Sequence, residues 1–247
     1  MKNIFKKIVQ YYLKLLTKLV LWRHRPFIIA VAGTTNKTVV KEYILKFLRE
    51  KYGYREVRGN PRSYNTEIGL PLAILYLESG ESSMIKWLKI LAQAKIKALF
   101  SRKFPSKLVL ELGVEKKGDM KYLLEIVRPN WVVVTNIEGS YSDAESNLDE
   151  ITDEMKYLVK KILESGKLIY NFDDERVKII AGFSKAEAIS YGLSDEAHAR
   201  ALNLKTTVQG QTFDFSFRDK KESIEIKKYG RHNVYAWMIA KIVKEIL

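Results

Sequence analysis

The stretch that decides the fold spans residues 28–38 and reads Ile-Ile-Ala-Val-Ala-Gly-Thr-Thr-Asn-Lys-Thr. Its first five residues are apolar and rich in β-branched side chains, which is typical of a buried strand. Gly33 and two threonines then form a turn, and a helical pattern follows the Lys37-Thr38 pair. The stretch therefore predicts a strand, a short loop and a helix that begins near a lysine and a threonine.

This order of elements predicts a phosphate-binding loop. Backbone N–H groups and the positive end of the helix dipole would face the anion. Lys37 would reach the outer phosphates, and the Thr38 hydroxyl would bind Mg²⁺. The residues expected around the phosphates are Gly33, Thr34, Thr35, Asn36, Lys37 and Thr38. The alternative is an ordinary buried strand with a polar turn that caps the next helix.

The loop departs from the general pattern G-x-x-x-x-G-K-[ST] at one position. The residue before the lysine is Asn36 instead of glycine. Asparagine is the residue that, after glycine, best tolerates left-handed backbone geometry. We therefore expect Asn36 to keep the loop shape and to add a side chain close to the phosphates.

Composition narrows the class of protein. With 247 residues and 47% hydrophobic content, the chain can form one large domain or two small ones. It has no cysteine, which excludes disulfides, thiolate metal sites and a cysteine nucleophile. Its three histidines, His24, His198 and His232, are far apart in sequence, which argues against a zinc enzyme.

The net charge of +14 is distributed unevenly. No acidic residue precedes Glu42, and a second acid-free stretch runs from residue 82 to residue 110, whereas residues 138–154 are acidic. This asymmetry indicates anionic partners, such as nucleotide phosphates, a nucleotide-sugar or an anionic membrane surface. Because no motif for base readout is present, we expect no nucleic-acid partner.

Two basic segments have the apolar period of amphipathic helices. Residues 3–22 are expected to place one face on the rest of the protein or on an anionic membrane surface. Lysines interrupt this segment, so it is not expected to cross a bilayer. The apolar residues assigned to this face are Ile4, Phe5, Ile8, Val9, Tyr12, Leu13, Leu16, Leu19 and Val20. In the second segment, residues 83–100, the packing face is expected to contain Met84, Trp87, Leu88, Leu91 and Ala94.

Strands and helices alternate over residues 27–192, which predicts a mostly parallel α/β sheet with helices on both faces. The expected strands are residues 28–32, 55–58, 107–113, 131–137, 167–171 and 188–192. From residue 199 to residue 227 the period changes to two, which predicts a small antiparallel sheet near the C-terminus. A helix from Val234 follows. We divide the chain into an N-terminal helix, residues 1–25, and a domain of residues 26–247.

Glu111 ends the expected strand at residues 107–113. In a parallel sheet, a carboxylate at the carboxyl end of a strand points into the ligand crevice. Beside a phosphate loop it is a candidate Mg²⁺ ligand, although a plain surface acid is the alternative.

Several stretches, in this order and spacing, resemble the central ATP-binding domain of the Mur ligases, above all the members that add D-alanyl-D-alanine to the UDP-muramoyl peptide. They are GTTNKT with VVKE, NTEIGLPLAIL, LELGVEKKGDMKYLLEIVRPNWVVVTNI, NFDDERV and GRHNVYA. The resemblance covers roughly residues 27–240.

The resemblance implies an α/β ATP-binding domain that acts in ATP-dependent amide bond formation through an acyl phosphate, in cytoplasmic peptidoglycan precursor synthesis. ATP and Mg²⁺ would be the cofactors, and a UDP-muramoyl-peptide and an amine the substrates. Lys37 and Glu111 would be catalytic, with Thr38 and Glu111 as metal ligands. Asn171, Arg231, His232 and Asn233 would lie around the nucleotide. Asn65, Thr66 and Glu67 would face the muramoyl-peptide.

Three departures from the family pattern affect phosphate and metal handling. Asn36 replaces a glycine, and Tyr141-Ser142-Asp143 stands where the family has His-Leu-Glu. Glu154-Met155 stands in place of Glu-Lys, with Lys156 one residue late and so about 100° around the helix. A phenol and a thioether are poor substitutes at a hard-cation site, so we expect one Mg²⁺ and loss of the second metal.

The resemblance does not extend to the N- and C-terminal domains of the family. The chain is therefore expected to be a fragment, one half of a split enzyme whose other chain supplies those domains, or a degenerate nucleotide-binding paralogue. A ligase for another polymer, such as a poly-glutamate ligase, is a further alternative. Residues 1–25 would place the protein at the inner face of the membrane if they bind lipid.

Overall fold

The computed structural model describes residues 2–61, 64–81, 83–139 and 145–247. Its strands are β1 (Phe27–Ala32), β2 (Val57–Gly59), β3 (Lys107–Glu111), β4 (Trp131–Val134), β5 (Lys167–Asn171), β6 (Glu187–Gly192), β7 (Ala199–Thr207), β8 (Gly210–Phe217) and β9 (Lys220–Ile226). Its helices are α1 (Lys2–His24), α2 (Lys37–Tyr52), α3 (Gly69–Leu75), α4 (Met84–Phe100), α5 (Asp119–Ile126), α6 (Glu145–Lys160), α7 (Glu175–Ala181) and α8 (Arg231–Ile246).

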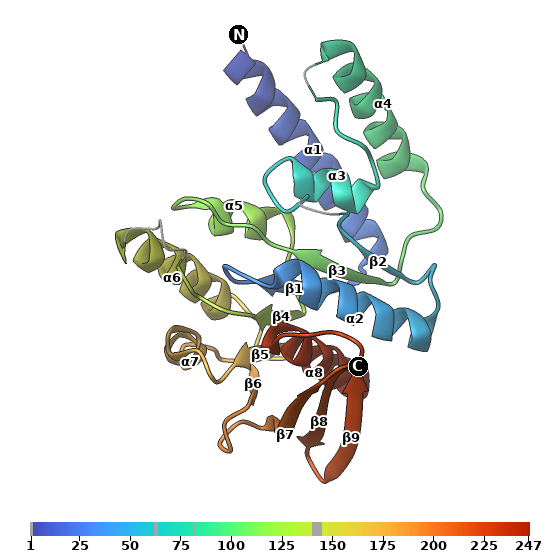
Figure 1. Ribbon diagram of the computed structural model, residues 1–247. Coiled ribbons are helices and arrows are strands. Elements are labelled where there is room, and N and C mark those ends of the chain that lie inside the picture. Colours follow the sequence, from blue (N-terminus) through green and yellow to red (C-terminus); the bar gives the residue numbers. More distant parts are fainter. Residues whose placement is uncertain (1, 62–63, 82, 140–144) are drawn as a thin grey trace.

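The strands form one mixed sheet in the order β2-β3-β1-β4-β5-β6-β7-β8-β9 (Figure 1). All pairs from β2 to β7 are parallel, and β7, β8 and β9 are antiparallel. The predicted parallel sheet and C-terminal antiparallel strands are therefore confirmed. The two parts are continuous, because Tyr191 and Gly192 of β6 pair with Ala199 and Arg200 of β7.

The central strand β1 contributes to both faces of the sheet. Ile29 and Val31 belong to a cluster of buried residues under α2 and α8, while Ile28, Ala30 and Ala32 belong to a cluster under α5, α6 and α7. Successive side chains of a strand point to opposite faces, so a strand covered on both sides is apolar throughout. The expected helices on both faces of the sheet are confirmed (Figure 1).

Several element ends differ from the sequence-based expectations. β3 ends at Glu111 and β4 at Val134, earlier than expected, because the chain leaves the sheet there to form loops at its carboxyl edge. β2 begins at Val57 instead of Arg55. α8 begins at Arg231, so the Arg-His-Asn motif forms its first turn and Gly230 precedes it as the N-cap.

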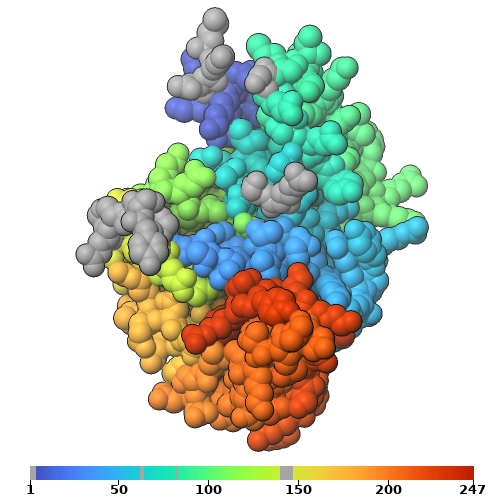
Figure 2. All heavy atoms as spheres, viewed as in Figure 1, coloured from blue at the N-terminus to red at the C-terminus, as the bar shows by residue number. Residues whose placement is uncertain are grey.

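Two helices form an arm beyond the sheet. In Figure 1 and Figure 2, α1 and α4 lie side by side above the main body of the molecule. With α3 they enclose a third cluster of buried residues, which includes Val9 and Leu13 of α1 and Ile90 and Ala94 of α4. Helix α1 thus packs one apolar face on the rest of the chain. No described helix combines the length and apolarity that crossing a membrane requires.

The prediction of which residues form the packing faces of α1 and α4 is wrong for four residues. Ile4 and Ile8 of α1, and Met84 and Leu88 of α4, are exposed. At about 100° per residue, Ile4 and Ile8 lie 100–140° around the helix from the buried Val9. Each helix therefore carries two apolar stripes, and only one of them packs.

Candidate functional site

The loop after β1 is held against the segment that follows β4. The Thr34 amide and hydroxyl both donate to the Asn136 carbonyl, at 2.7 and 3.0 Å. Gly33 has φ +134°, and a Cβ there would lie 2.2 Å from the Thr135 hydroxyl oxygen. Only glycine fits this position, because the backbone conformation and the close approach both exclude a side chain.

Asn36 adopts the left-handed geometry expected of it. Its φ is 64° and its ψ is 0°, and it is the N-cap residue of α2. Its side chain makes no cap hydrogen bond and instead donates to the Thr35 hydroxyl at 3.3 Å. The first-turn N–H groups of a helix have no partner within the helix, so the start of α2 presents donors at the loop.

The Lys37 ammonium lies over the loop. Its Nζ donates to the Gly33 carbonyl at 2.8 Å and to the Thr34 carbonyl at 2.9 Å. Burial lowers the pKa of Lys37, and the nearby Glu111 carboxylate offsets part of that effect. An ammonium has three donors, so one remains for an anion placed against the loop.

Glu111 is the centre of a polar cluster beside the loop. β1 and β3 are neighbours in the sheet, with Val31 paired to Glu111. One carboxylate oxygen accepts from the Thr38 hydroxyl at 2.9 Å, and the other accepts from the Asn65 amide at 2.8 Å. Three residues selected from the sequence, on α2, on β3 and before α3, thus lie in direct contact.

Sequence reasoning missed two residues that contact or lie beside Glu111. Lys41 is fully buried, and its Nζ donates to the Asn60 carbonyl at 2.7 Å and lies 4.0 Å from a Glu111 oxygen. The Asn60 side chain accepts from the Glu111 amide at 2.8 Å and donates to the Glu111 carbonyl at 3.1 Å. The signal for Lys41 was its spacing, since it stands one turn after Lys37 on the same helix face.

A second polar group forms where β5 meets α8. The Asn171 side-chain oxygen accepts from the Asp173 amide at 3.0 Å. The Asp173 carboxylate in turn accepts from the Tyr235 hydroxyl of α8 at 2.7 Å. Burial, together with the hydrogen bond to Asp173, raises the pKa of Tyr235.

The Arg-His-Asn motif divides between surface and interior. Arg231 and His232 are exposed at the start of α8, whereas Asn233 is buried and donates to the Tyr229 carbonyl at 2.7 Å. Asn233 also lies 2.9 Å from a ring nitrogen of His232.

The segment after β4 is hydrogen-bonded both to the phosphate-loop candidate and to Asp174, the residue next to Asp173. Asn136 accepts from Thr34 of the phosphate-loop candidate, and the next residue, Ile137, donates its amide to Asp174 at 2.8 Å. The groups follow the carboxyl ends of β1, β3, β4 and β5. This edge is where ligands bind in open α/β sheets, close to the point where the strand order reverses on either side of β1.

The rest of the loop predicted to face the muramoyl-peptide lies just beyond Glu111. Thr66 and Glu67 line a small depression with Gly113 and Asp119. The Glu67 carboxylate lies 3.9 Å from the Lys116 ammonium. Only Asn65 of the three residues contacts Glu111 among the hydrogen bonds of the described residues.

The residues that the resemblance aligns with second-metal positions make structural contacts here. Met155 is fully buried in the apolar cluster under α5, α6 and α7. The Lys156 ammonium lies 4.0 Å from the centre of the Phe183 ring. Glu154 accepts from the amides of Gly118 and Met120, both at 2.8 Å, and so caps α5. Tyr141-Ser142-Asp143 lies outside the described residues.

The described donor set suits a single Mg²⁺ that is shared with phosphates. The described part of the chain contains no group of three or more His, Asp or Glu side chains that could hold a metal. Mg²⁺ in nucleotide sites needs only one or two protein ligands, since phosphate oxygens and waters supply the others. The Thr38 hydroxyl and the Glu111 carboxylate, in mutual contact beside the loop, meet that requirement.

Comparison with known proteins matches this chain to one family of enzymes. A sequence model described as the Mur ligase middle domain matches residues 90–243. The UDP-N-acetylmuramoyl-tripeptide–D-alanyl-D-alanine ligase of Borreliella burgdorferi is 27% identical over 222 residues, which are 84% of this chain and 38% of that enzyme. This chain therefore spans well under half the length of that relative.

Solved structures show the same fold. The MurF ligase of Thermotoga maritima in complex with ADP superimposes with a TM-score of 0.73 at 19% identity, over 96% of this chain and 49% of that one. The Mycobacterium tuberculosis folylpolyglutamate synthase complexed with ADP and AMPPCP gives a TM-score of 0.64 at 14% identity, over 96% of this chain and 58% of that one.

Proposed function

Because this chain belongs to the Mur ligase family through its middle domain, we propose that it binds ATP with one Mg²⁺ at the loop of residues 33–38. The observation that carries the proposal is the direct contact of Thr38 with Glu111 beside the Lys37 ammonium. These groups provide a cation, a helix N-terminus and two oxygen ligands for a hard metal ion, all at the carboxyl edge of the sheet. That combination suits a polyphosphate.

Each part of the site has a defined task in this proposal. The start of α2 and Lys37 hold the β- and γ-phosphates, with Gly33 allowing the loop to lie close to them. Thr38 and Glu111 hold Mg²⁺, which when bound neutralises phosphate charge. Asn171, Arg231, His232 and Asn233 surround the rest of the nucleotide, supported by the hydrogen-bonded path from Thr34 to Asp174.

We further propose that this site serves ATP-dependent amide bond formation in peptidoglycan precursor synthesis. A substrate carboxylate attacks the γ-phosphorus, ADP leaves, and an amine then displaces phosphate from the acyl phosphate. Lys37 stabilises the charge on the transferring phosphoryl group, and the protein acts by positioning and electrostatics. The loop of Asn65, Thr66 and Glu67 faces the UDP-muramoyl-peptide, supported by the contact of Asn65 with Glu111.

This catalytic role requires binding surfaces for the UDP-muramoyl-peptide and for the amine. In the proposal, the surfaces beyond the loop of Asn65, Thr66 and Glu67 come from outside the middle domain, in a longer form of this chain or in a separate chain. ATP turnover tests the role directly. With muramoyl-tripeptide and D-alanyl-D-alanine present, the chain together with those surfaces is expected to release ADP in proportion to the amide formed.

A second candidate is a nucleotide-binding relative without ligase activity. The observation that favours it is Met155, which is buried in the core where the family pattern has a lysine. The same assay separates the two candidates. ATP binding with no ADP release in the presence of both substrates would favour the non-catalytic relative.

Glu111→Gln is expected to weaken Mg-ATP binding by at least about tenfold, because changes around a metal site typically cost 10–100-fold in metal affinity. The amide keeps the size of the side chain but removes its charge. Calorimetric titration with ATP, in Mg²⁺ and again in EDTA, measures the effect. The difference from the unmodified chain should vanish in EDTA.

The matched control for this prediction is Glu115→Gln, since Glu115 is an exposed carboxylate shortly after the same strand. It should bind Mg-ATP as the unmodified chain does. An equal loss in both variants would mean that general surface charge, and not a metal ligand, was removed.

A further inference from the structure

The second apolar stripe of α1 has no packing partner among the described residues. Ile4, Ile8, Tyr11, Leu15 and Trp22 recur every three, four or seven positions, and between 47% and 69% of each is exposed. At 100° per residue they form one narrow stripe, roughly opposite the buried stripe of Val9, Leu13 and Val20. Large apolar side chains gathered on one exposed face mark an interaction site.

This stripe leads into a basic cleft. A cleft of about 830 Å³ lies between the C-terminal end of α1, α5 and the end of α6. Its lining includes Lys18, Trp22, Arg25, Lys121, Arg128 and Lys161. Among the described lining residues the one carboxylate is Glu125, which is already paired with the Lys14 ammonium. That pairing, through a hydrogen bond from Lys14, lowers the pKa of Glu125.

The cleft is separate from the nucleotide site. Its lining includes Ile28 near the start of β1 and Asn130 just before β4, which are at the amino ends of those strands. The phosphate-loop candidate follows the carboxyl ends of the same strands. The two features therefore lie at opposite edges of the sheet, and the cleft has no part in the proposed ATP chemistry.

We propose that the α1 face, defined as the exposed stripe of α1 together with the basic cleft, binds the surface of an anionic lipid bilayer. In this arrangement α1 lies in the interface with Ile8 and Leu15 toward the acyl chains and Trp22 at the level of the headgroups. Lys18, Lys121 and Lys161 contact the phosphate groups.

The charge and composition of the α1 face favour an anionic bilayer over a second copy of the chain. α1 has no Asp or Glu, and its sequence combines lysines with Tyr, Trp, Leu and Ile, as helices that lie in membrane interfaces do. Tyr and Trp favour the headgroup level. A second copy of the chain is a poor occupant, because each copy carries +14 and would bring the same basic face against itself.

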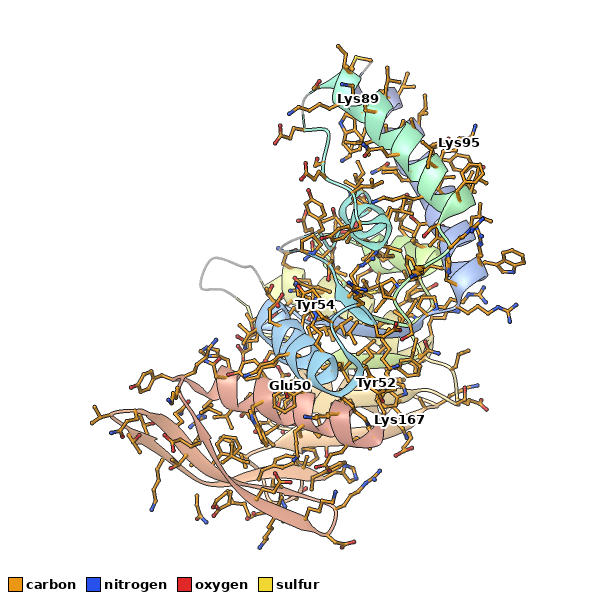
Figure 3. All side chains as sticks on the ribbon, turned by 90° about the vertical axis from the view of Figure 1, so that its right-hand side faces the viewer. Glu50, Tyr52, Tyr54, Lys89, Lys95 and Lys167 are labelled. Atoms are coloured by element: carbon orange, nitrogen blue, oxygen red, sulfur yellow. The ribbon has the colours of Figure 1, made fainter. Side chains whose placement is uncertain are left out.

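Helix α4 supplies a matched control surface. Its exposed residues Ile85, Leu88, Ile96 and Leu99 lie opposite its own packing face, as the stripe of α1 does. Because α1 and α4 pack on each other, the two stripes point away from one another. Figure 3 shows α4 in front of α1, with Lys89 and Lys95 on α4. One flat bilayer cannot contact both stripes.

Vesicle sedimentation with the full chain tests the proposal. The probes are vesicles of phosphatidylglycerol and phosphatidylcholine in equal parts, and vesicles of phosphatidylcholine alone. We expect the double variants Ile8→Ser/Leu15→Ser and Lys121→Glu/Lys161→Glu each to lower partitioning onto the anionic vesicles at least about tenfold. All four residues are exposed, so the fold should persist.

The corresponding changes on α4, Leu88→Ser/Ile96→Ser and Lys89→Glu/Lys95→Glu, should leave partitioning within about twofold, since the α4 stripe faces away. Equal losses from the α1 and α4 variants would overturn the assignment to the α1 face. So would the absence of binding to the anionic vesicles, or equal binding to both vesicle types.

Trp22 provides a second measurement. It is 69% exposed, whereas Trp87 and Trp131 are buried and Trp237 is half-buried. Anionic vesicles should shift the tryptophan emission to shorter wavelength, and Trp22→Phe should abolish the shift. A shift that occurs with glycerol phosphate alone would indicate a soluble anion site, and one that depends on protein concentration without lipid would indicate self-association. Either result would overturn the proposal. The proposal does not depend on whether the chain binds ATP, so the result of ATP titrations neither supports nor contradicts it.

Discussion

Lys41→Ala is expected to lower the free energy of unfolding by about 3–5 kcal/mol, the cost of removing one partner from a buried ion pair. The Lys41 ammonium is fully buried and donates to the Asn60 carbonyl at 2.7 Å. It lies 4.0 Å from the buried Glu111 carboxylate and 3.3 Å from the exposed Glu42 carboxylate. Without it, the buried Asn60 carbonyl and the buried Glu111 carboxylate both lose a charged neighbour.

Urea unfolding followed by circular dichroism measures this loss. Lys46→Ala is the control, because Lys46 is an exposed lysine of the same helix and should change stability by no more than about 0.5 kcal/mol. Lys41→Met separates charge from packing, since methionine retains most of the hydrocarbon chain. It should remain clearly destabilised. A Lys41→Met variant as stable as the unmodified chain would show that the ion pair has no structural role.

Gly33→Ala should destabilise the chain by about 2–6 kcal/mol and abolish ATP binding. The unusual backbone conformation costs a residue with a side chain about 1–3 kcal/mol, and forcing atoms together costs about 1–3 kcal/mol more. The added methyl would lie 2.2 Å from the Thr135 hydroxyl and 2.9 Å from the Asn136 carbonyl, both of which hold the loop in place. Relief of that clash must move the loop away from the segment after β4.

Gly53→Ala is the matched control for this substitution. Gly53 also has a positive φ, of 92°, but a Cβ there meets nothing within 4 Å. It should show only the cost of backbone strain, about 1–3 kcal/mol, with normal ATP binding. Thermal melts and nucleotide titrations of the two variants measure both effects. Equal behaviour of the two would mean that the contact with Thr135 is unimportant.

Local patterns predicted most of the fold. The β-branched run before Gly33 and the alternation of strands with helices were sufficient for the parallel sheet, because burial on both faces leaves an unbroken apolar strand. The geometry of Asn36 was also predictable, since it depends on the backbone preference of one residue. The position of Glu111 beside the phosphate-loop candidate was predictable as well, since ligands of a parallel sheet bind at the carboxyl ends of its strands.

The missed features depend on contacts between distant parts of the chain. Apart from its spacing one turn after Lys37, Lys41 reads as one more surface lysine of a basic helix. The position of Asn60 and Glu111 around it explains its burial. The two apolar stripes of α1 are equally regular in the sequence. Nothing within that helix tells which stripe packs on α3 and α4, so Ile4 and Ile8 were assigned to the wrong face.

The polar groups at the carboxyl edge of the sheet therefore differ in how well they suit a nucleotide. Lys37, Thr38 and Glu111 form one connected cluster that is suited to phosphates and one hard cation. Of the residues that the resemblance aligns with second-metal positions, Met155 lies in the core and Glu154 caps α5. Nucleotide binding therefore requires only this cluster and the loop, whereas ligase activity also requires surfaces for two further substrates.

Titration of Mg-ATP into the purified chain, beside Lys37→Ala and Lys46→Ala, measures nucleotide binding at residues 33–38. Lys37→Ala should raise the dissociation constant about 10- to 100-fold, since a hydrogen bond from a charged donor contributes about 1.5–3 kcal/mol. Lys46→Ala should match the unmodified chain, because Lys46 is an exposed residue farther along the same helix. No measurable binding, or equal binding by Lys37→Ala and the unmodified chain, would contradict the assignment of residues 33–38 as the phosphate loop.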